Sequence, residues 1–595
     1  MSQRKMLMGN QAMALGALRA GVRFVSGYPG TPSTEVLETC AKERGQQVYV
    51  EWSVNEKAAL EFGGGAAMAG GYSLVTMKQV GLNACADPAM TLSYVGIKGA
   101  LVLLVADDPG PISSQTEQDT RRFAGYSKIP VLDPSSVQEA YEMMAEAFAL
   151  SHELGMPVIL RPTTRICHGC ADVELKEDLP VCPEISLEKG GRWVIFPKSS
   201  YQNHIRLEEL NRRYAQILSG SPFNELRGEG KRLVVASGVS YAYALEALET
   251  LRAEAKLLKI ATPYPVPEGL ALRALQGVEE ALVLEELDPV VEDALQQLCG
   301  KAGLSVRIRG KRSGDLPFAG EYGVELAQEV LGAFLGLARP KAEALPPAPP
   351  LPVRPPVLCA GCPHRASFYA VKKAMEGKKS AFCGDIGCYT LGNAQPLDMV
   401  DTCLCMGAGI TQAQGIKRAD PDIHAFAFVG DSTFFHSGIT GVVNAVYNQH
   451  KITLIVLDNS TTAMTGHQPH PGIGKTMMGE VSAKVSIEAL LRAIGVETVL
   501  TVDPLRLPQA IEAVRQADEA PGVSAVIFRS PCIAVTKPGR PLRVKDSCIG
   551  CQRCIREIGC PALFLRDGKA AVDPGLCVGC GLCKSLCPVK AIEEE

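Results

Sequence analysis

Short apolar runs separated by helical patterns recur along the first third of the chain. They are FVSGYPG (24–30), SLVTMKQ (73–79), ALVLLVADD (100–108) and PVIL (157–160). Apolar runs of this length are typical of buried strands, and their alternation with helices indicates βαβ units and a parallel sheet. We therefore expect residues 1–180 to form one α/β domain.

The same alternation returns twice further along the chain. RLVVASG, LLKIATPYP, ALVLEEL and SVRIRG predict a smaller α/β domain at 231–339, in which no motif carries chemistry. The polar residues 181–230 are expected to connect the two. The segment PKAEALPPAPPLPVRPP (340–356) is proline-rich, which favours a semi-rigid, extended linker. A third α/β domain is predicted at 357–536 and a distinct small domain at 540–595.

Composition narrows the class of protein. The 595 residues carry a formal net charge of −4, so bulk electrostatics give no reason to expect nucleic acid or an anionic membrane as partner. No apolar run reaches the ~18 residues that indicate a membrane span. The N-terminal MSQRKMLMGNQAMALGALRAG lacks the continuous apolar core of a signal peptide. We expect a cytoplasmic protein whose many thiols stay reduced.

Eight of the 21 cysteines lie between residues 548 and 587, in two runs. The second run reads C-x2-C-x2-C-x3-C-P, and the first differs by two extra residues before its last cysteine. In this pattern the fourth cysteine of each run binds the cluster of the other run. Structural zinc uses paired C-x2-C motifs instead. The tail resembles a two-cluster ferredoxin domain of α+β fold. One [4Fe-4S] cluster is assigned to Cys548, Cys551, Cys554 and Cys587, and the second to Cys577, Cys580, Cys583 and Cys560.

The third α/β domain contains a predicted ligand site. HAFAFV (424–429) and ITLIVL (452–457) read as buried strands joined by a helix, the unit that forms a right-handed crossover. Asp431 and Asn459 then follow the carboxyl ends of parallel strands, where α/β sheets bind ligands. Their oxygens suit Mg²⁺, and the helix start suits phosphate. The alternative is an ordinary crossover with a chance Gly-Asp. Two other segments, PHPGIGKT and GGGAAMAG, fail as phosphate motifs because Pro469 and Met68 replace required glycines.

The stretch GDS…LDN resembles the thiamine diphosphate motif, in which GDG is followed by a later Asn. Asn459 lies 28 positions after Asp431. The resemblance assigns Gly430, Asp431 and Ser432 to the motif. It gives Mg²⁺ three ligands: Asp431, the Asn459 side chain and the Thr461 main-chain carbonyl. Ser432 replaces the usual third glycine, which is a departure from the pattern.

A second domain of thiamine diphosphate enzymes supplies a glutamate to the aminopyrimidine ring. VNEKAALEFGGGAAMAGG resembles the segment that carries it, and Glu56 matches that position, with Glu61 as the competing residue. Taken alone, either would be a solvated helix residue. SGYPGTPSTEV resembles a segment of the 2-oxoacid:ferredoxin oxidoreductases, in which the threonine matching Thr31 lies near the substrate carboxylate. The alternative is a Pro/Gly turn with Ser and Thr caps.

A third [4Fe-4S] cluster follows from the same resemblance. Four dispersed cysteines correspond to those that hold the cluster nearest the thiamine cofactor in these oxidoreductases: Cys359, Cys362, Cys388 and Cys532. The alternative is free buried cysteines, which are common. Cys383, Cys403 and Cys405 compete for the same role. Cys167 and Cys170 form another C-x2-C without a second pair, and we expect them to be structural.

Domain order and motifs together resemble the alpha subunits of the indolepyruvate:ferredoxin oxidoreductase family. The resemblance implies two thiamine-diphosphate-type domains, a small α/β domain and a ferredoxin-like tail. It also implies oxidative decarboxylation of arylpyruvates (indolepyruvate, phenylpyruvate and hydroxyphenylpyruvate) with coenzyme A, giving aryl-acetyl-CoA, CO2 and reduced ferredoxin. A smaller beta subunit is the implied partner. Segments 77–88 and 106–121 are expected to line the substrate or coenzyme A side. Two alternatives stay open: another 2-oxoacid as substrate, or a non-catalytic electron-transfer subunit.

Overall fold

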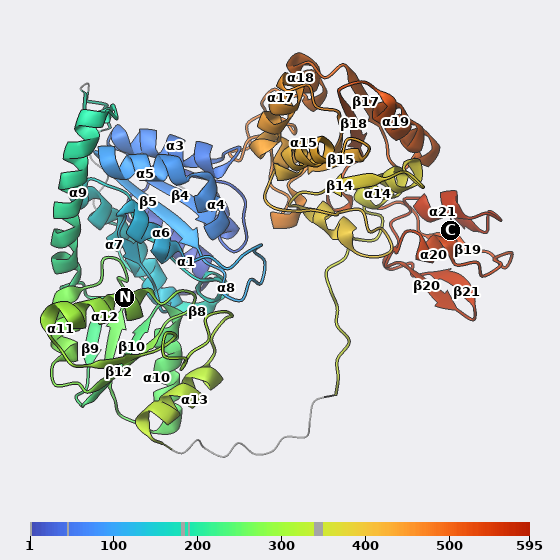
Figure 1. Cartoon of the computed structure of the whole chain (residues 1–595). Helices are drawn as coiled ribbons and strands as arrows, with labels where there is room; N and C mark the ends of the chain where they lie inside the picture. Colours follow the sequence, from blue (N-terminus) through green and yellow to red (C-terminus); the bar gives the residue numbers. More distant parts are fainter. Residues whose placement is uncertain (1–2, 44–46, 180–184, 189–190, 338–348, 595) are drawn as a thin grey trace. The chain divides into compact units, whose positions relative to one another are not determined.

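The computed structural model describes residues 3–43, 47–179, 185–188, 191–337 and 349–594. The chain forms two compact units, Met1–Pro347 and Ala348–Glu595 (Figure 1). We describe each unit by itself.

The first unit contains a six-stranded parallel sheet with the strand order β3-β2-β4-β5-β7-β6. The strands are β2 (Phe24–Gly27), β3 (Tyr49–Trp52), β4 (Tyr72–Lys78), β5 (Ala100–Ala106), β6 (Val131–Leu132) and β7 (Val158–Leu160). Four of them overlap the apolar runs, so the predicted parallel α/β fold is confirmed here. Every residue of β5 is buried, as in a central strand covered on both faces.

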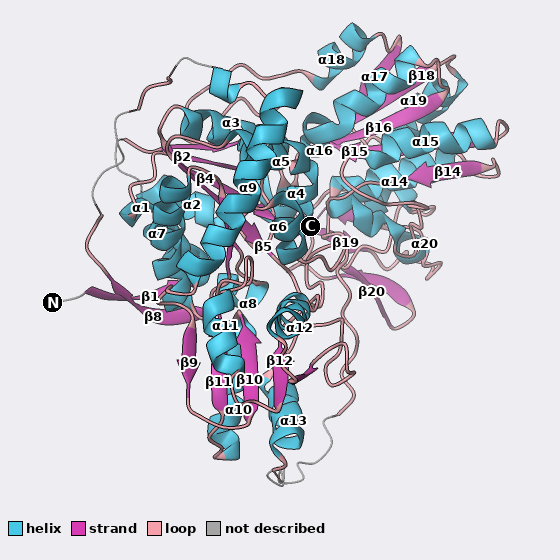
Figure 2. Ribbon diagram, turned by 60° about the vertical axis from the view of Figure 1, so that its left-hand side comes forward, coloured by secondary structure: helices cyan, strands magenta, loops and turns pink. Residues whose placement is uncertain are grey.

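Helices cover both faces of this sheet (Figure 2). Helices α1 (Gly9–Arg19), α2 (Thr34–Glu43) and α7 (Val137–Leu154) pack together, as do α3 (Glu56–Met68), α5 (Ala86–Val95) and α9 (Pro197–Leu218). Helix α9 has 22 residues and lies in the segment predicted as a connection, of which residues 180–184 and 189–190 are outside the described residues. Strand β1 (Gln3–Met8) pairs antiparallel with β8 (Cys170–Leu175), a pairing that the apolar pattern does not indicate.

A second sheet in this unit has the order β13-β12-β10-β11-β9. Its strands are β9 (Glu225–Arg227), β10 (Arg232–Ser237), β11 (Lys256–Ile260), β12 (Glu280–Leu284) and β13 (Arg307–Arg309). All pair in parallel except β9. This is the smaller α/β fold expected from the second group of apolar runs.

Buried ion pairs join the two sheets of the first unit. Arg121, at the start of α6 (Thr120–Ser127), is 1% exposed. Its guanidinium donates to Glu285 at 2.8 Å, just beyond β12, and to Asp119 at 2.7 Å. Arg161 similarly contacts Asp107 at 2.7 Å and Asp133 at 3.2 Å, and Asp133 accepts from Ser237 at the end of β10.

The second unit is built on a five-stranded parallel sheet with the order β14-β15-β16-β18-β17. Its strands are β14 (Ser380–Cys383), β15 (His424–Gly430), β16 (Ile452–Asp458), β17 (Thr498–Val502) and β18 (Val523–Arg529). Phe426 and Phe428 of β15 face one core, and Ala425, Ala427 and Val429 face the other. Since strand side chains alternate between faces, β15 is covered on both sides, and only His424 at its start is partly exposed.

The cysteine-rich tail adds two short antiparallel pairs to this unit. These are β19 (Leu542–Val544) with β22 (Ile592–Glu594), and β20 (Leu563–Arg566) with β21 (Lys569–Val572). Its helices α20 (Arg553–Arg556) and α21 (Leu582–Leu586) carry cysteines. One continuous apolar core contains both Phe368 of α14 (Pro363–Ala374) and Leu582 of the tail. The predicted boundary near residue 540 therefore lies across a shared core.

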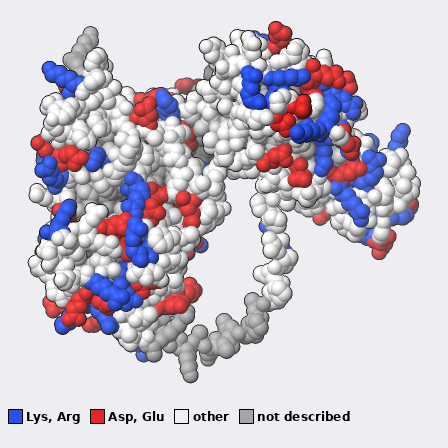
Figure 3. All heavy atoms as spheres, viewed as in Figure 1, with Lys and Arg blue, Asp and Glu red and all other residues white. Residues whose placement is uncertain are grey.

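The remaining sequence predictions concern the linker and the surface. Residues 338–348 are outside the described residues, and 349–356 form neither helix nor strand. Within the part of the chain that is described, no helix combines the length and apolar composition needed to cross a membrane. Figure 3 shows acidic and basic side chains interspersed on the visible face of each unit, in keeping with the net charge of −4.

Candidate functional site

Asp431 lies directly after β15 and is 3% exposed. Its carboxylate accepts main-chain hydrogen bonds from Ser432 at 2.9 Å and from Ser460 at 2.7 Å. The second bond ties it to the loop that follows β16. Burial raises the pKa of Asp431, and a contact of 3.1 Å with His470 Nε2 opposes this rise. The carboxylate is thus held rigidly at the junction of two neighbouring strands.

Asn459 and Thr461 lie in that neighbouring loop, and both are buried. The Asn459 Oδ1 accepts from the Thr461 amide at 3.2 Å, and its Nδ2 lies 3.2 Å from His364 Nε2. The structure therefore brings together the three residues that the sequence assigns to Mg²⁺. Ser432 is also buried, and its hydroxyl accepts from Thr462 Oγ1 at 3.0 Å.

The residues present fit a hydrated Mg²⁺ and a diphosphate. A carboxylate, an amide oxygen and a main-chain carbonyl are the hard oxygen donors that Mg²⁺ takes. The Thr461 hydroxyl is buried without a hydrogen-bond partner among the described residues, so a polar group is available beside these donors. His364 and His470 were not singled out from the sequence. His364 directly follows the C-x2-C-P of LCAGCPHR, which was the available signal.

Glu56 occupies the first turn of α3 in the other unit and is 7% exposed. Asn55 caps the helix by accepting from the Ala58 amide at 2.8 Å. A Cβ added to Gly81 would lie 2.6 Å from Glu56 Oε1, so only glycine leaves room for this carboxylate. Glu61, in contrast, pairs with Lys57 at the surface, where its side chain is 51% exposed. The structure thus separates the two competing glutamates by burial.

Thr31 lies in the loop after β2, and its main-chain carbonyl accepts from Ser113 Oγ at 3.4 Å. Strand β4, the neighbour of β2 in the sheet, ends at Lys78. The Lys78 side chain would contact a Cβ placed on Gly30. Burial lowers the pKa of Lys78, and the charges of Asp108 and Glu56 oppose that change. Segments 77–88 and 106–121 therefore meet Thr31 and Glu56 at the carboxyl edge of the first sheet. Lys78 is a cation at this edge that was not singled out individually from the sequence.

Four cysteines of the second unit form a neighbouring group, here called the proximal set: Cys359, Cys362, Cys388 and Cys532. Burial raises the pKa of Cys388 to about 11, and the Cys532 and Cys359 thiols add to the rise. Burial likewise raises the pKa of Cys362 to about 12, with contributions from Cys359 and Cys388. Cys388 therefore lies within electrostatic range of Cys359, Cys362 and Cys532.

The competing cysteines lie elsewhere. Burial and the charge of Asp385 raise the pKa of both Cys403 and Cys405, and the Cys405 thiol adds to the rise at Cys403. The buried Cys383 contacts Thr402. Cys167 is buried in α8 (Thr164–His168), and Cys170 is exposed at the start of β8. The first three thus differ in position from the proximal set, and the last two belong to the other unit.

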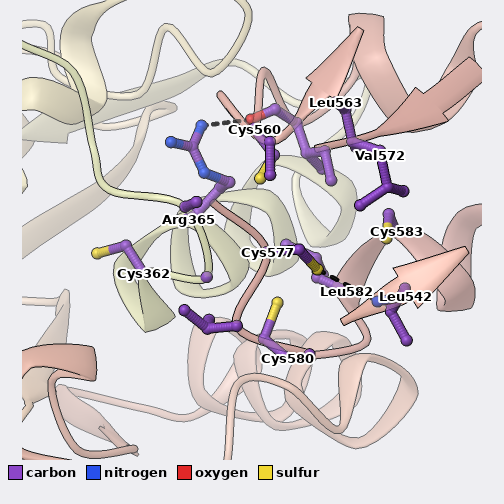
Figure 4. A pocket seen from close by; sticks show the side chains of 16 residues that line it. Cys362, Arg365, Leu542, Cys560, Leu563, Val572, Cys577, Cys580, Leu582 and Cys583 are labelled. Carbon is purple, nitrogen blue, oxygen red and sulfur yellow. Dashed lines mark hydrogen bonds between the residues drawn. The ribbon is translucent and has the colours of Figure 1, made fainter. Parts of the chain in front are cut away.

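The tail cysteines form two further groups. The middle set, Cys560, Cys577, Cys580 and Cys583, lines one cavity, seen from close by in Figure 4. The outer set, Cys548, Cys551, Cys554 and Cys587, lines another. Burial raises the pKa of Cys554 to about 11, and the other three thiols of the outer set add to it. Each cavity thus takes three cysteines from one run and the fourth from the other.

The middle and outer sets each surround a cavity. Among the residues described, no group of three or more His, Cys, Asp or Glu side chains is arranged to hold a single metal ion. A [4Fe-4S] cube instead binds one thiolate at each of four irons, so its cysteines surround a space. The cavities lined by the middle and outer sets fit that requirement.

Comparison with known families finds three matching regions of the chain. A family described as thiamine pyrophosphate enzyme, C-terminal TPP binding domain, matches residues 385–528. Pyruvate flavodoxin/ferredoxin oxidoreductase, thiamine diphosphate-binding, matches 15–191, and a 4Fe-4S binding domain matches 570–593. The matched regions contain Glu56, Asp431 and the second cysteine run.

Full-length relatives decide the family. Proteins named indolepyruvate oxidoreductase subunit IorA are 40% identical to this chain in Methanothermobacter thermautotrophicus, covering 99% of this chain and 97% of the relative. The relative in Pyrococcus abyssi is also 40% identical, covering 100% and 97%. The chain belongs to the IorA family of indolepyruvate oxidoreductase subunits. The IorA resemblance predicted from the motifs is thereby confirmed.

Membership in the IorA family makes the chain a subunit of an oxidoreductase with thiamine diphosphate and 4Fe-4S binding domains. The 2-oxoglutarate synthase subunit KorA of Archaeoglobus fulgidus is a more distant relative, 26% identical over 50% of this chain and 91% of the relative. A solved 2-oxoglutarate:ferredoxin oxidoreductase from Magnetococcus marinus is 16% identical, with a TM-score of 0.46 over 56% of this chain and 66% of that one, too weak a likeness to bear on the site.

Proposed function

We propose that this chain is the cofactor-bearing subunit of an enzyme that oxidises arylpyruvates, such as indolepyruvate, to aryl-acetyl-CoA. The observation that carries the proposal is the 2.9 Å hydrogen bond from the Cys532 amide to the Asn459 carbonyl. It joins the candidate Mg²⁺–diphosphate site to the proximal set. Electrons released at the first would therefore have a one-electron carrier next to them.

The overall reaction balances as one 2-oxoacid and one coenzyme A thiol giving one acyl thioester, one CO2, one proton and two electrons. The C1–C2 bond of the 2-oxoacid breaks, and a C–S bond to coenzyme A forms. Thiamine diphosphate supplies, when bound, the carbanion-stabilising chemistry that decarboxylation needs. The proposed ligands for its Mg²⁺ are Asp431, Asn459 and the Thr461 carbonyl, with Gly430 and Ser432 shaping the turn at the diphosphate.

The first unit contributes residues at the edge of its sheet. Glu56 is proposed to hold a proton against the aminopyrimidine ring, a role suited to a buried carboxylate. Thr31 is proposed to donate to the substrate carboxylate. Lys78 adds a positive charge beside it, supported by its position next to Gly30.

Three cysteine sets suggest three [4Fe-4S] carriers in series. The proximal set adjoins Asn459 through Cys532, and a Cβ on Gly361 would lie 2.0 Å from Val578 of the middle-set loop. The Cys554 thiol of the outer set in turn contributes to the raised pKa of Cys583 in the middle set. We propose that electrons follow this order and leave from the outer set to a ferredoxin. A smaller beta subunit is the proposed partner, since the relatives are named as subunits.

The test is anaerobic purification of the chain with its smaller subunit, followed by iron and thiamine diphosphate quantitation and a substrate panel. Indolepyruvate, phenylpyruvate, hydroxyphenylpyruvate, pyruvate and 2-oxoglutarate would each be supplied with coenzyme A and a viologen dye. Reduction of the dye with the arylpyruvates supports the proposal. Preference for pyruvate or 2-oxoglutarate would show that the substrate is another 2-oxoacid. Absence of bound thiamine diphosphate would favour a non-catalytic electron-transfer subunit.

A further inference from the structure

Arg365 is a buried cation of helix α14, and its exposure is 4%. Its Nη1 donates to the main-chain carbonyls of Ile558 at 2.5 Å and Gly559 at 2.9 Å, and its Nη2 donates to the Leu358 carbonyl at 2.6 Å. All three acceptors are neutral. The guanidinium is therefore fixed in position without an opposing charge from these partners.

No carboxylate pairs with Arg365 in the described part of the chain, and its buried Nε has no hydrogen-bond partner there. A buried guanidinium without a counterion is costly, because it has lost its hydration. The ionisable groups that act on it most strongly are thiols: Cys560, Cys362, Cys580 and Cys359. Two of these belong to the middle set and two to the proximal set.

Arg365 thus lies between two cysteine sets. It lines the cavity of the middle set together with Cys362 of the proximal set, and Figure 4 shows its guanidinium beside Cys560. The Cys359–Cys362 loop packs closely on the middle-set loop, because Gly361 leaves no space for a side chain against Val578. The hydrogen bonds to Ile558 and Gly559 bind α14 to the turn just before Cys560.

We propose that Arg365 is the shared counterion of the proximal and middle clusters and raises the reduction potential of both. Reduction adds one negative charge to a cluster, and a fixed positive charge nearby in a medium of low dielectric stabilises that form. The charge acts on both sites because both sets face it. Transfer between them moves one electron, leaves one site oxidised and the other reduced, and makes or breaks no bond.

This inference rests on the proposed function only for the presence of the clusters. Its test is therefore a redox titration of the full chain with its smaller subunit, poised by mediators and followed by EPR, without substrate. The neutral variant Arg365→Gln is expected to lower the reduction potentials of the proximal and middle clusters by at least about 59 mV. For a one-electron couple this is about a tenfold change in the equilibrium constant of reduction. The outer cluster should change least.

Two further variants make the result decisive. Lys373→Gln removes one positive charge from the same helix at a partly exposed position and is expected to leave all potentials unchanged. Arg365→Lys retains the charge and is expected to keep potentials near those of the unaltered chain. Unchanged potentials in an Arg365→Gln protein with full iron content would overturn the proposal. If Arg365→Gln fails to assemble, a fallen potential in Arg365→Lys would overturn it, and a retained one would support it.

If Arg365→Gln shifts the potentials as expected but the unaltered protein turns over none of the arylpyruvates, the proposed function fails and this role of Arg365 stands. Conversely, normal turnover with an unshifted Arg365→Gln titration would leave the proposed function intact and remove the counterion. The two hypotheses therefore fail separately.

Discussion

The main-chain amide of Cys532 donates to the carbonyl of Asn459 across 2.9 Å. One residue is a candidate Mg²⁺ ligand, and the other belongs to the proximal cysteine set. Cys532 follows β18, which pairs with β16, so the two loops leave adjacent parallel strands. Sheet topology thus places the candidate cofactor site and the first candidate electron carrier next to each other.

Replacing Cys532 tests the proximal cluster. Cys532→Ser is expected to lower the iron content by about four per chain, because a [4Fe-4S] cube needs all of its thiolates. Cys405→Ser, at an exposed thiol outside the set, serves as the matched control and should keep full iron. Iron and sulfide analysis with EPR provides the readout. Equal iron in both variants would reject the assignment.

Asp431→Asn tests the Mg²⁺ site. Loss of the anionic ligand is expected to weaken binding of Mg²⁺–thiamine diphosphate by at least about tenfold, or about 1.4 kcal/mol. The control is Asp458→Asn, since Asp458 pairs with Arg529 at the end of the neighbouring strand. Isothermal titration calorimetry gives the affinities. Similar losses in the two variants would point to a general effect of charge on the fold.

Glu56→Gln tests the activating carboxylate. Turnover is expected to fall about 100-fold or more, the usual size of a general acid–base contribution, while iron content and cofactor binding persist. The surface variant Glu61→Gln should retain activity. Near-normal turnover of Glu56→Gln would remove Glu56 from the proposed mechanism, and a loss confined to Glu61→Gln would transfer the role to that residue.

Arg121→Ala tests how the two sheets of the first unit are joined. Its removal leaves Asp119 and Glu285 buried without their cation, which is expected to cost about 3–5 kcal/mol in the free energy of unfolding. Arg122→Ala breaks partly exposed pairs instead and should cost less than about 1 kcal/mol. Denaturant titration of the full chain measures both. Equal costs would contradict the buried network.

Glu286 predicts a pH dependence of stability. Burial raises its pKa from 4.5 to about 7. The folded state therefore binds a proton more tightly than the unfolded state. The stability that this proton provides is full below pH 4.5 and is lost as the pH rises through about 7. Glu286→Gln should flatten this fall, whereas Glu249→Gln, at an exposed position, should not. Parallel pH profiles of unfolding in all three proteins would exclude the effect.

Much of the fold follows from local pattern. The apolar runs at 424–429 and 452–457 lie within β15 and β16 because strands buried on both faces need continuous apolar sequence. Helix α9 escaped this reasoning because it is polar and has only four buried residues, Leu207, Tyr214, Ala215 and Leu218. The pairing of β1 with β8 joins residues more than 160 positions apart, which a local pattern does not encode.

The candidate site divides in the same way. Cysteine spacing singled out Cys548, whereas Asp431 was identified from its place after a predicted strand and from the resemblance to the thiamine diphosphate motif. Arg365, His470 and Lys78 gave no such signal, since each acquires its surroundings only when distant segments fold together. Glu56 was preferred to Glu61 because it matches the family segment; both lie on α3, and in the structure burial distinguishes them. The catalytic and metal-binding roles stay predictions until the variants are measured.

The common interior of α14 and the cysteine-rich tail has a consequence for engineering. One engineering aim would be to exchange the ferredoxin-like domain for one with a different reduction potential. Here the interface between the tail and the rest of the unit is filled with side chains from both, among them Phe368 and Leu582. A replacement domain would therefore require matching substitutions on the surface that it packs against. Residues 540–595 are thus structurally continuous with the domain that they pack against.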